Sequence, residues 1–162
     1  MTNSLVTGAG HRLGRAMALY LASRGHDVAV HYATSEDAAL KVVAEIKAMG
    51  RNAIAVQADL LIEDDAHSLV ARAAEQLGGP ILYLVNNAST FEHDTIGSAS
   101  RDTWDHNMGS NLRAPFILTQ AMAAQDLPER LDGEGEPIAV GLIVNMVDQR
   151  VRKLTPDFMT YT

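Results

Sequence analysis

The sequence predicts an α/β fold in which a doubly wound parallel sheet lies between two layers of helices. Short apolar runs alternate along the chain with longer segments in which apolar residues recur at helical spacing. The short runs are apolar on both faces, which is typical of parallel strands that helices cover on both sides. Because connections between parallel strands are right-handed, helices are expected on both faces of the sheet. A glycine-rich turn between the first strand and the first helix is also typical of this class.

Five strands and four helices are expected in alternation. The strands are expected at residues 3–7, 27–32, 53–57, 81–85 and 138–146, and the helices at residues 12–25, 36–49, 63–77 and 101–127. Ser35 is a suitable N-cap for the second helix, and Gly50 a suitable stop. The polar stretch 128–137 is expected to be a surface loop within one domain that covers residues 1–162.

Length and composition fit a single globular domain and exclude several classes of function. The chain has 162 residues, of which 47% are apolar and 20% are charged. The net charge of −7 argues against a nucleic-acid partner, because no basic cluster is available for phosphates. The absence of cysteine excludes disulfides and thiolate metal sites. No apolar run approaches the ~18 residues that span a bilayer, and no signal peptide is recognisable, so a cytoplasmic location without membrane contact is expected.

The stretch NSLVTGAGHRLGR at residues 3–15 is the strongest indication of a nucleotide site. A strand, a glycine turn and a helix in this order present free backbone N–H groups to a phosphate. The spacing is T-G-x-x-x-R-L-G, with Gly8 and Gly14 as the outer glycines and Arg12 where a middle glycine often stands. The alternative is a helix that merely begins after a glycine turn.

Residues 31–35 (HYATS), which follow the second strand, bear on the choice of nucleotide. An acidic residue about 20 positions beyond the glycine turn would bind the adenosine ribose hydroxyls and favour NAD. No acidic residue stands there. Arg12 and Ser35, with His11 or His31 nearby, are instead candidates for binding a 2′-phosphate, so NADP is favoured over NAD.

Polar residues also follow the third and fourth strands. Asp59 can accept a hydrogen bond from an adenine amino group, although an aspartate at such a place is more often a helix cap or a loop residue. Asn86 and Asn87 end a buried strand, where two amides are costly unless they are hydrogen-bonded. They are expected either to hold neighbouring strands together or to touch a ligand.

Three further residues are candidates for chemistry. Asn111 lies inside the long helix, and Pro115 should free the carbonyl of residue 111 and kink the helix there, so that the carbonyl can hold a water. A local side-chain bond of Asn111 is the alternative. Tyr161 and Asp148 are the titratable candidates near the end of the chain. The histidines at 26, 67, 93 and 106 have no spacing that suggests a metal site, and none is expected.

Together these residues resemble the short-chain dehydrogenase/reductase family, over the whole chain and in the family's order. The matching elements are Thr7-Gly8-x-x-x-Arg12-Leu13-Gly14, Asp59-Leu60, Asn86-Asn87-Ala88-Ser89, Asn111 and the stretch from Asn145 to Tyr161. The resemblance implies a Rossmann-type sheet. The chain looks most like the pteridine reductase branch, which includes bacterial dihydromonapterin or dihydrofolate reductases. The signs of that branch are Arg12, His31-Tyr32-x-x-Ser35, Asn87-Ala88-Ser89-Thr90-Phe91, and Asp148 where most members carry serine.

The resemblance implies hydride transfer from NADPH to a C=N bond of a pterin, or to a carbonyl. Tyr161 would be the proton donor, with a lysine four residues later that lowers the pKa of its phenol and binds the nicotinamide ribose. Asp148 would carry or relay the proton, and Asn111 would hold a water that links the lysine to solvent. Ser89 would contact cofactor or substrate, and Phe91 would stack on the pterin ring. An aromatic ring packed under a loop is the alternative for Phe91.

The residues expected at the site fall into three sets by the part of the reaction they serve. The catalytic set is Tyr161, Asp148 and Asn111. The substrate set is Ser89, Phe91, Asp148 and Tyr161. The set for NADP(H) is Gly8, His11, Arg12, Leu13, Gly14, His31, Tyr32, Ser35, Asp59, Leu60, Asn87, Ala88 and Ser89.

Two features depart from the pattern of that branch. The branch often has a basic residue after the second strand, but Ala33 and Thr34 stand there, so NADP rests mainly on Arg12 and Ser35. The position four residues after Tyr161 lies beyond Thr162. We therefore expect the chain to be the N-terminal two-thirds of a longer protein, cut before the last strands, with the fifth strand on an uncovered apolar edge.

Two other functions are compatible with the sequence. One is a ketone or 3-oxoacyl reductase of the same family, in which Asp148 is incidental. The other is a non-catalytic protein that only binds NADP. A homotetramer is what the family resemblance implies.

Overall fold

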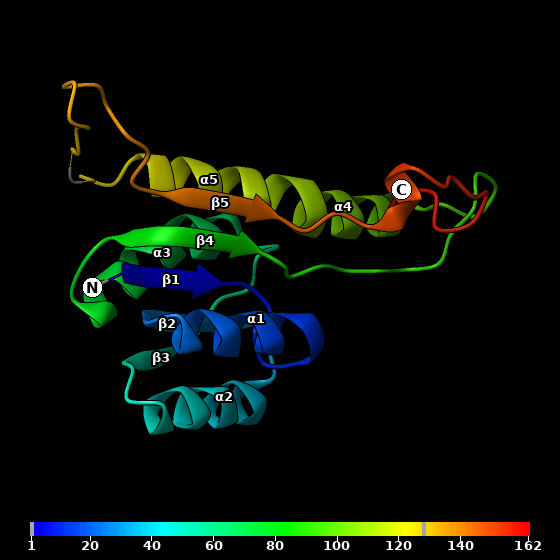
Figure 1. The fold of residues 1–162 in the computed structure, drawn as a ribbon. Coiled ribbons are helices and arrows are strands. Elements are labelled where there is room, and N and C mark those ends of the chain that lie inside the picture. The colour runs from blue at the N-terminus through cyan, green and yellow to red at the C-terminus, as the bar shows by residue number, and fades with distance from the viewer. Residues whose placement is uncertain (1, 128) are drawn as a thin grey trace.

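The computed structural model describes residues 2–127 and 129–162 and contains one five-stranded parallel sheet (Figure 1). The strands are β1 (Thr2–Val6), β2 (His26–Tyr32), β3 (Ala53–Gln57), β4 (Ile81–Asn86) and β5 (Leu142–Asn145). Their order across the sheet is β3-β2-β1-β4-β5. The chain thus builds outward from β1 to one edge, then crosses to the other side of β1. This order confirms the predicted doubly wound fold, with its switch point between β1 and β4.

Helices cover both faces of the sheet. One face is packed by α1 (Arg12–Ser23) and α2 (Glu36–Ala48), whose buried residues include Ala18, Ala22, Val42 and Ile46. The other face is packed by α3 (Glu63–Leu77) and α5 (Ala114–Ala123). The helix α4 (Arg101–Met108) continues the line of α5 past the carboxyl ends of the strands (Figure 1). Within the described residues, no helix is both long and apolar enough to cross a membrane.

Most predicted elements lie within two residues of their predicted bounds, and β3 and α3 match them residue for residue. The first two strands begin one residue earlier than predicted, and α1 ends at Ser23. Gly50 stops α2 as expected, with a left-handed φ of 77°. Ser35 stands at the N-cap of α2, but its side chain makes no cap hydrogen bond.

The predicted continuous helix 101–127 is wrong. A π-helical turn, η1 (Gly109–Arg113), separates α4 from α5, and Pro115 lies in the first turn of α5. The predicted break near Asn111 therefore takes the form of a π turn. The chain leaves α5 at Ala123 because Gln125 is bound elsewhere: its side chain accepts the N–H of Ile81 at 2.8 Å and donates to the carbonyl of Ile81 at 3.0 Å. Pro128, in the predicted loop 128–137, lies outside the described residues.

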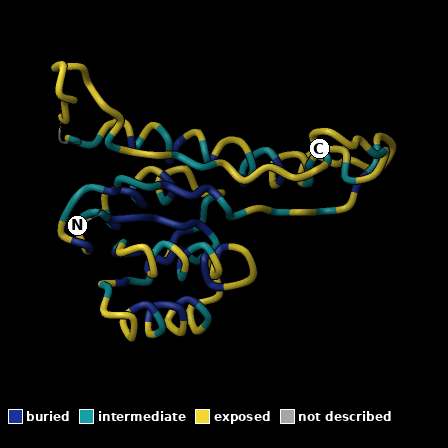
Figure 2. The backbone as a smooth tube through the Cα atoms, in the orientation of Figure 1, coloured by how far each residue is buried: buried dark blue, intermediate teal, exposed yellow. Residues whose placement is uncertain are grey.

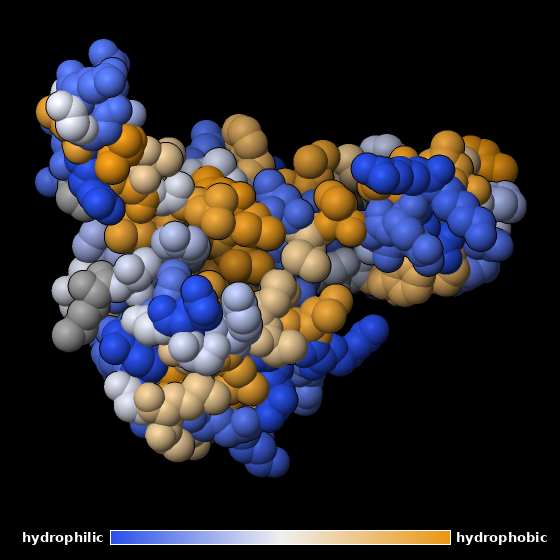
Figure 3. Space-filling view, viewed as in Figure 1, coloured by the Kyte–Doolittle hydropathy of each residue, from blue (hydrophilic) through white to orange (hydrophobic). Residues whose placement is uncertain are grey.

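The predicted strand 138–146 is also too long, because β5 includes only four residues. It pairs with Tyr83–Asn86 of β4 alone and forms an edge of the sheet. Gly141, the residue before β5, packs closely against Leu82 and Met122. A Cβ on Gly141 would lie 3.2 Å from the carbonyl oxygen of Leu82. Figure 2 shows that β1 and β2 are buried whereas β5 and the following segment are mostly exposed. Apolar side chains gather on this face, and Leu142 is 49% exposed (Figure 3).

The carboxyl ends of β1 and β4 are joined by side chains. The hydroxyl of Thr7 accepts the N–H groups of Asn87 and Ala88, each at 2.9 Å. In return, the amide of Asn87 donates to the carbonyls of Thr7 at 2.9 Å and Gly8 at 3.3 Å. We call these bonds the Thr7–Asn87 clasp. The amino end of α1 packs directly on the clasp, since a Cβ on Gly14 would lie 2.3 Å from the Gly8 oxygen.

His31 fixes the glycine turn from the side of β2. The N–H of Gly8 donates to Nδ1 of His31 at 3.0 Å, and Nε2 of His31 donates to the carbonyl of Ala58 at 3.1 Å. An acceptor at Nδ1 and a donor at Nε2 define a neutral ring. Burial lowers the pKa of His31 to about 4, in keeping with that state. Of the two histidines expected near a 2′-phosphate, His31 has a buried ring with both nitrogens bonded inside the protein, which leaves His11 as the available one.

We predict that Gly14→Ala destabilises the protein by about 2–3 kcal/mol, because the new methyl group collides with backbone that cannot move without opening the clasp. The measurement is urea unfolding. The matched control is Gly133→Ala, where a Cβ meets nothing within 4 Å. Equal unfolding free energies for the two variants would contradict the close packing of α1 on the clasp.

We predict that the neutral His31 ring makes stability depend on pH below 6.5. The unfolded state binds a proton near pH 6.5, but the folded state does so only near 4, so stability present above pH 6.5 is lost as the pH falls toward 4. The loss is on the order of 2–3 kcal/mol. His31→Gln should flatten this part of the stability–pH curve relative to His67→Gln, which removes an exposed ring. The account of His31 is refuted if the two curves fall equally.

Candidate active site

The predicted site residues gather at the carboxyl edge of the sheet. The glycine turn, the ends of β2 and β4, and the segment 148–161 all lie on this side, and loop 89–100 runs beside the C-terminal segment (Figure 1). No group of three acidic or histidine side chains that could hold a metal ion occurs among residues 2–127 and 129–162. Two regions can be distinguished along this edge. One lies at the amino ends of α1 and α2, and the other surrounds Tyr161.

The amino end of α1 is open to an anion. Its first turn contains N–H groups that have no partner within the helix, and its N-cap, His11, provides no side-chain acceptor. Such an end favours a bound phosphate. Gly8 has a φ of 61°, and a Cβ there would lie 3.1 Å from the backbone of Ala88. The glycines therefore keep the turn narrow and its backbone accessible.

Arg12 has a left-handed backbone, with a φ of 48°. This conformation costs a non-glycine residue about 1–2 kcal/mol, which explains why a glycine is common at the middle position of such turns. The side chains of His11, Arg12 and Leu13 are exposed beside the turn. Among the described residues, Arg12 makes no ion pair, whereas the neighbouring Arg15 is bound to Glu45 at 2.6 Å.

An open groove lies between the starts of α1 and α2. Gly10, His11, Thr34, Ser35 and Lys41 contribute to its lining. Ser35 is exposed, and Tyr32 is half-buried at the end of β2. Of the residues predicted to bind a 2′-phosphate, the structure brings Ser35 and His11 to this groove, with Arg12 beside His11. His31 is the exception because it lies beneath the turn.

Asp59 and Leu60 form the loop before α3. The carboxylate of Asp59 accepts the N–H of Leu61 at 3.0 Å, and the N–H of Asp59 donates to Asp65 at 2.9 Å. The side chain of Asp59 thus closes a loop, which was the alternative considered for it, and its predicted contact with adenine stays a prediction. Leu60 packs partly buried against the core.

The two asparagines at the end of β4 and directly after it hold neighbouring strands together. Nδ2 of Asn86 donates to Oδ1 of Asn145 at 2.8 Å, which joins β4 to β5. Asn87 belongs to the Thr7–Asn87 clasp, and Ala88 packs against Gly8. Of the two roles expected for these amides, the structure therefore shows the one that holds neighbouring strands. Thr7, which the sequence analysis did not include among the site residues, is the partner that makes this possible.

Tyr161 and Asp148 meet at the far end of the edge. The phenol of Tyr161 donates to Oδ2 of Asp148 at 3.4 Å, although 12 residues separate them in the sequence. Oδ1 of Asp148 accepts the N–H of Arg150 at 2.9 Å and so starts the short helical turn η2 (Gln149–Val151). Burial raises the pKa of Tyr161, and the adjacent Asp148 carboxylate raises it further, while the Ser89 hydroxyl acts in the opposite direction. The phenol is therefore protonated at neutral pH.

An aromatic cluster lies against Tyr161. The ring of Phe91 stacks on that of Phe158, with centroids 4.1 Å apart and planes 6° apart. The rings of Tyr161 and Phe91 are nearly perpendicular, with centroids 4.7 Å apart. The guanidinium of Arg150 lies 4.6 Å from the Phe158 ring. Phe91 is half exposed, so it is not simply packed under a loop, and a flat ligand can reach this cluster.

Sequence reasoning missed Phe158 and Arg150. Phe158 has a left-handed φ of 56°, which no sequence pattern indicated and which is unusual for a bulky residue. The spacing of three residues between Phe158 and Tyr161 was the one available signal, since it places both side chains near each other in a tight turn.

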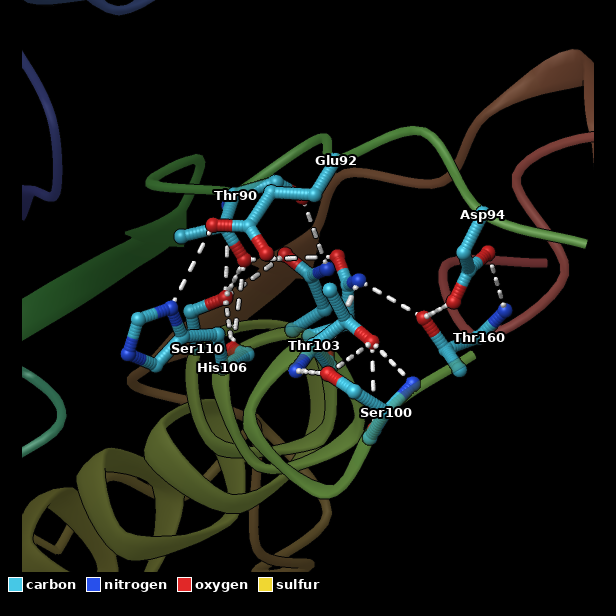
Figure 4. Close-up of polar contacts among 10 residues, drawn as sticks. Thr90, Glu92, Asp94, Ser100, Thr103, His106, Ser110 and Thr160 are labelled. Carbon is cyan, nitrogen blue, oxygen red and sulfur yellow. Dashed lines mark hydrogen bonds and ion pairs between the residues drawn. The ribbon is translucent and has the colours of Figure 1, made fainter. Parts of the chain in front are cut away.

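Asn111 and Ser89 both bind the carbonyl of Thr90, to which the hydroxyl of Ser89 donates at 3.1 Å. The side chain of Asn111 donates to the carbonyl of Thr90 at 3.0 Å and accepts from Ser110 at 3.2 Å. The hydroxyls of Thr90 and Ser110 lie 2.6 Å apart, as Figure 4 shows. These bonds join the loop after β4 to the π turn. Asn111 therefore makes the local side-chain bonds that were its alternative, and its predicted bound water stays a prediction.

Comparisons with known proteins agree on the family. The sequence profile of the short chain dehydrogenase family matches residues 2–161. The 3-oxoacyl-[acyl-carrier-protein] reductase FabG of Staphylococcus epidermidis is 37% identical over 128 residues, which are 79% of this chain and 52% of that protein.

Solved structures share the fold closely. FolM alternative dihydrofolate reductase 1 from Brucella suis, crystallised with NADP, is 42% identical with a TM-score of 0.87, and the match covers 99% of this chain and 63% of that one. The landomycin C-6 ketoreductase LanV, crystallised with NADP and rabelomycin, is 33% identical with a TM-score of 0.84, over 99% of this chain and 63% of that one. The chain thus spans between half and two-thirds of the length of these relatives. It belongs to the short-chain dehydrogenase family.

Proposed function

We propose that the protein is an NADP(H)-dependent reductase that adds a hydride to a C=N bond of a flat, pterin-type heterocycle. The observation that carries the proposal is the contact of the Tyr161 phenol with Asp148, 3.4 Å away, beside the half-exposed ring of Phe91. A proton donor, a carboxylate that orients it and an aromatic face for stacking are what such a reduction needs.

The chain's own residues fit the cofactor. A phosphate would be held by the first turn of α1, which has no side-chain cap, and the narrow turn at Gly8 and Gly14 leaves room for close approach of backbone. Arg12 and Ser35 would hold a 2′-phosphate, and this favours NADP over NAD. The FolM and LanV structures, both crystallised with NADP, support the same choice.

The proposed chemistry divides between cofactor and protein. When bound, NADPH supplies the hydride that adds to the carbon of the C=N bond. Tyr161 holds the proton that the substrate nitrogen takes up, and its raised pKa keeps that proton in place at neutral pH. Asp148 accepts the hydrogen bond that orients the phenol, and afterwards relays a proton from water to the phenolate.

The substrate class rests on two residues. Phe91, half exposed and stacked on Phe158 on one face, offers an aromatic surface to a flat heterocycle, and Asp148 can accept a hydrogen bond from the ring N–H or amino groups of a pterin. The similarity to FolM, named a dihydrofolate reductase, supports this class. A ketone or 3-oxoacyl reductase is the second candidate, because FabG is 37% identical and LanV is named a ketoreductase.

The test is NADPH oxidation with dihydrobiopterin, dihydrofolate and a panel of ketones and 3-oxoacyl thioesters. The proposal expects turnover with a pteridine at a kcat/KM at least ~10-fold above that for any ketone. Activity confined to ketones would overturn the pterin assignment. Tight NADPH binding without turnover of any compound would instead indicate a protein that only binds the nucleotide.

We predict that Arg12→Ala weakens NADPH binding by about 10-fold or more and NADH binding by less than about 3-fold, because a charged hydrogen bond to a phosphate contributes about 1.5–3 kcal/mol. Isothermal titration calorimetry measures both. Arg24→Ala, at the other end of α1, is the matched control and should change neither affinity. Equal losses for the two nucleotides would refute the role in 2′-phosphate binding.

We predict that Asp148→Asn moves the alkaline limb of the kcat profile to lower pH. The carboxylate destabilises the phenolate, so its removal lowers the pKa of Tyr161, and the proton needed for reduction is lost at a lower pH. Tyr161→Phe should reduce kcat by about 10²–10⁴-fold at every pH. An alkaline limb that stays in place in Asp148→Asn would contradict the coupling between the two groups.

A further inference from the structure

A buried cluster of polar side chains includes Thr160, the residue before Tyr161. It consists of Asp94 in the loop after β4, Asn107 in α4, and Thr160. Oδ2 of Asp94 accepts the hydroxyl of Thr160 at 2.6 Å, and Oδ1 accepts its backbone N–H at 3.1 Å (Figure 4). Nδ2 of Asn107 donates to the same hydroxyl at 2.7 Å. The hydroxyl of Thr160 is thus both a donor and an acceptor, and its direction is fixed.

The cluster contains a buried carboxylate, that of Asp94. Asp94 and Asn107 are each only 1% exposed, and Thr160 is 9% exposed. A buried carboxylate is costly unless hydrogen bonds compensate for its lost hydration. Among the described residues Asp94 makes no ion pair, and its donors come from Thr160, with the N–H of Met159 reaching its carbonyl at 3.4 Å. Release of the 159–160 segment would therefore leave the carboxylate without partners.

Asn107 ties this segment to the opposite wall of the site. Its Nδ2 also donates to the carbonyl of Thr103 at 3.1 Å, and its Oδ1 accepts from the hydroxyl of Thr90 at 3.4 Å. Thr90 is next to Phe91, and Thr160 is next to Tyr161. One side chain on α4 thus sets the spacing between the loop that carries the aromatic face and the segment that carries the phenol.

We propose that Asp94, Asn107 and Thr160 are positioning residues that hold the Tyr161 phenol against Asp148 and Phe91. The inference rests on the proposed function, because it assigns the cluster to the same proton donor. The hydrogen bonds from Thr160 hold the pKa of Asp94 below its usual value, so the carboxylate stays charged where the enzyme works. The contact of the phenol with Asp148 is long, at 3.4 Å, so the position of the phenol also depends on the segment behind it.

The test compares Thr160→Val, which keeps the shape but removes the hydroxyl, with Thr160→Ser, which keeps the hydroxyl. We expect Thr160→Val to lower kcat for NADPH-dependent reduction by about 10–100-fold, with the Kd for NADPH within about 2-fold of the parent. Thr160→Ser should keep kcat within about 3-fold. Asp157→Asn removes an exposed carboxylate from the same segment and should change neither quantity.

Asn107→Ala provides a second route if Thr160→Val does not fold, because it removes one anchor and leaves the Asp94 bonds intact. It should lower kcat by about 3–10-fold at unchanged NADPH affinity. The proposal is overturned if Thr160→Val and Thr160→Ser have the same kcat, or if Asn107→Ala keeps the parent value.

A readout without turnover separates this inference from the proposed function. With tyrosines labelled by ¹³C at Cζ, NMR titration follows the phenol of Tyr161, which is assigned from Tyr161→Phe. Its pKa is raised by burial and by Asp148, so we expect it to fall toward the ordinary value in Thr160→Val and to stay raised in Thr160→Ser. This result in a protein that reduces no substrate would sustain the positioning role and refute the reductase. An unchanged titration in Thr160→Val overturns the positioning role alone.

Discussion

The carboxyl edge of the sheet, where the predicted site residues gather, depends on the Thr7–Asn87 clasp. One hydroxyl accepts two backbone N–H groups from the chain after β4, and one amide donates to two carbonyls of the chain after β1. Thr7 is buried and all four hydrogen bonds are partly buried, so losing one partner would leave a polar group unpaired with little access to water. The clasp therefore fixes the two strand ends at the switch point of the sheet, where α/β folds bind ligands. The glycine turn, Ala88 and the loop toward Phe91 all start from it.

Strain is concentrated where function is proposed. Only two non-glycine residues in the described chain have positive φ angles, Arg12 and Phe158, and they lie at opposite ends of the edge. Each conformation costs on the order of 1–3 kcal/mol and persists only where the surroundings compensate. For Arg12 this backbone accompanies an exposed side chain beside the glycine turn that is proposed to bind a phosphate. For Phe158 it lays the ring flat on Phe91. Local preferences that are overridden in this way are typical of sites that are shaped for a ligand.

The fold could be predicted from the sequence because its signals are local. Apolar runs, helical periodicity and the stop at Gly50 predicted most elements to within two residues, and β3 and α3 were correct at both ends. The errors occurred where contacts between residues far apart in the sequence determine where an element begins or ends. Gln125 ends α5 by binding Ile81, 44 residues away. The length of β5 is set by its pairing with β4, which no local pattern indicates.

The sequence predicted which residues belong to the candidate site better than it predicted how they are arranged. Tyr161, Asp148 and Phe91 were expected at one site through a family resemblance. The structure brings them into contact, and their roles stay predictions. The orientation of His31 was not predictable, because the sequence does not show whether a polar ring near the end of a strand points into the turn or toward solvent. Asp94, Asn107 and Thr160 gave no signal at all, since each is an ordinary polar residue until the fold buries the three together.

The most direct measurement of the central claim is the fate of the hydride. The protein would be given NADPH that carries deuterium at C4 of the nicotinamide, in each of its two epimers, together with a dihydropteridine. The account predicts that one epimer delivers a single deuterium to the carbon of the reduced C=N bond and that the other delivers none. Bound NADPH that transfers deuterium from neither epimer, to a pteridine or to any carbonyl compound, would contradict it.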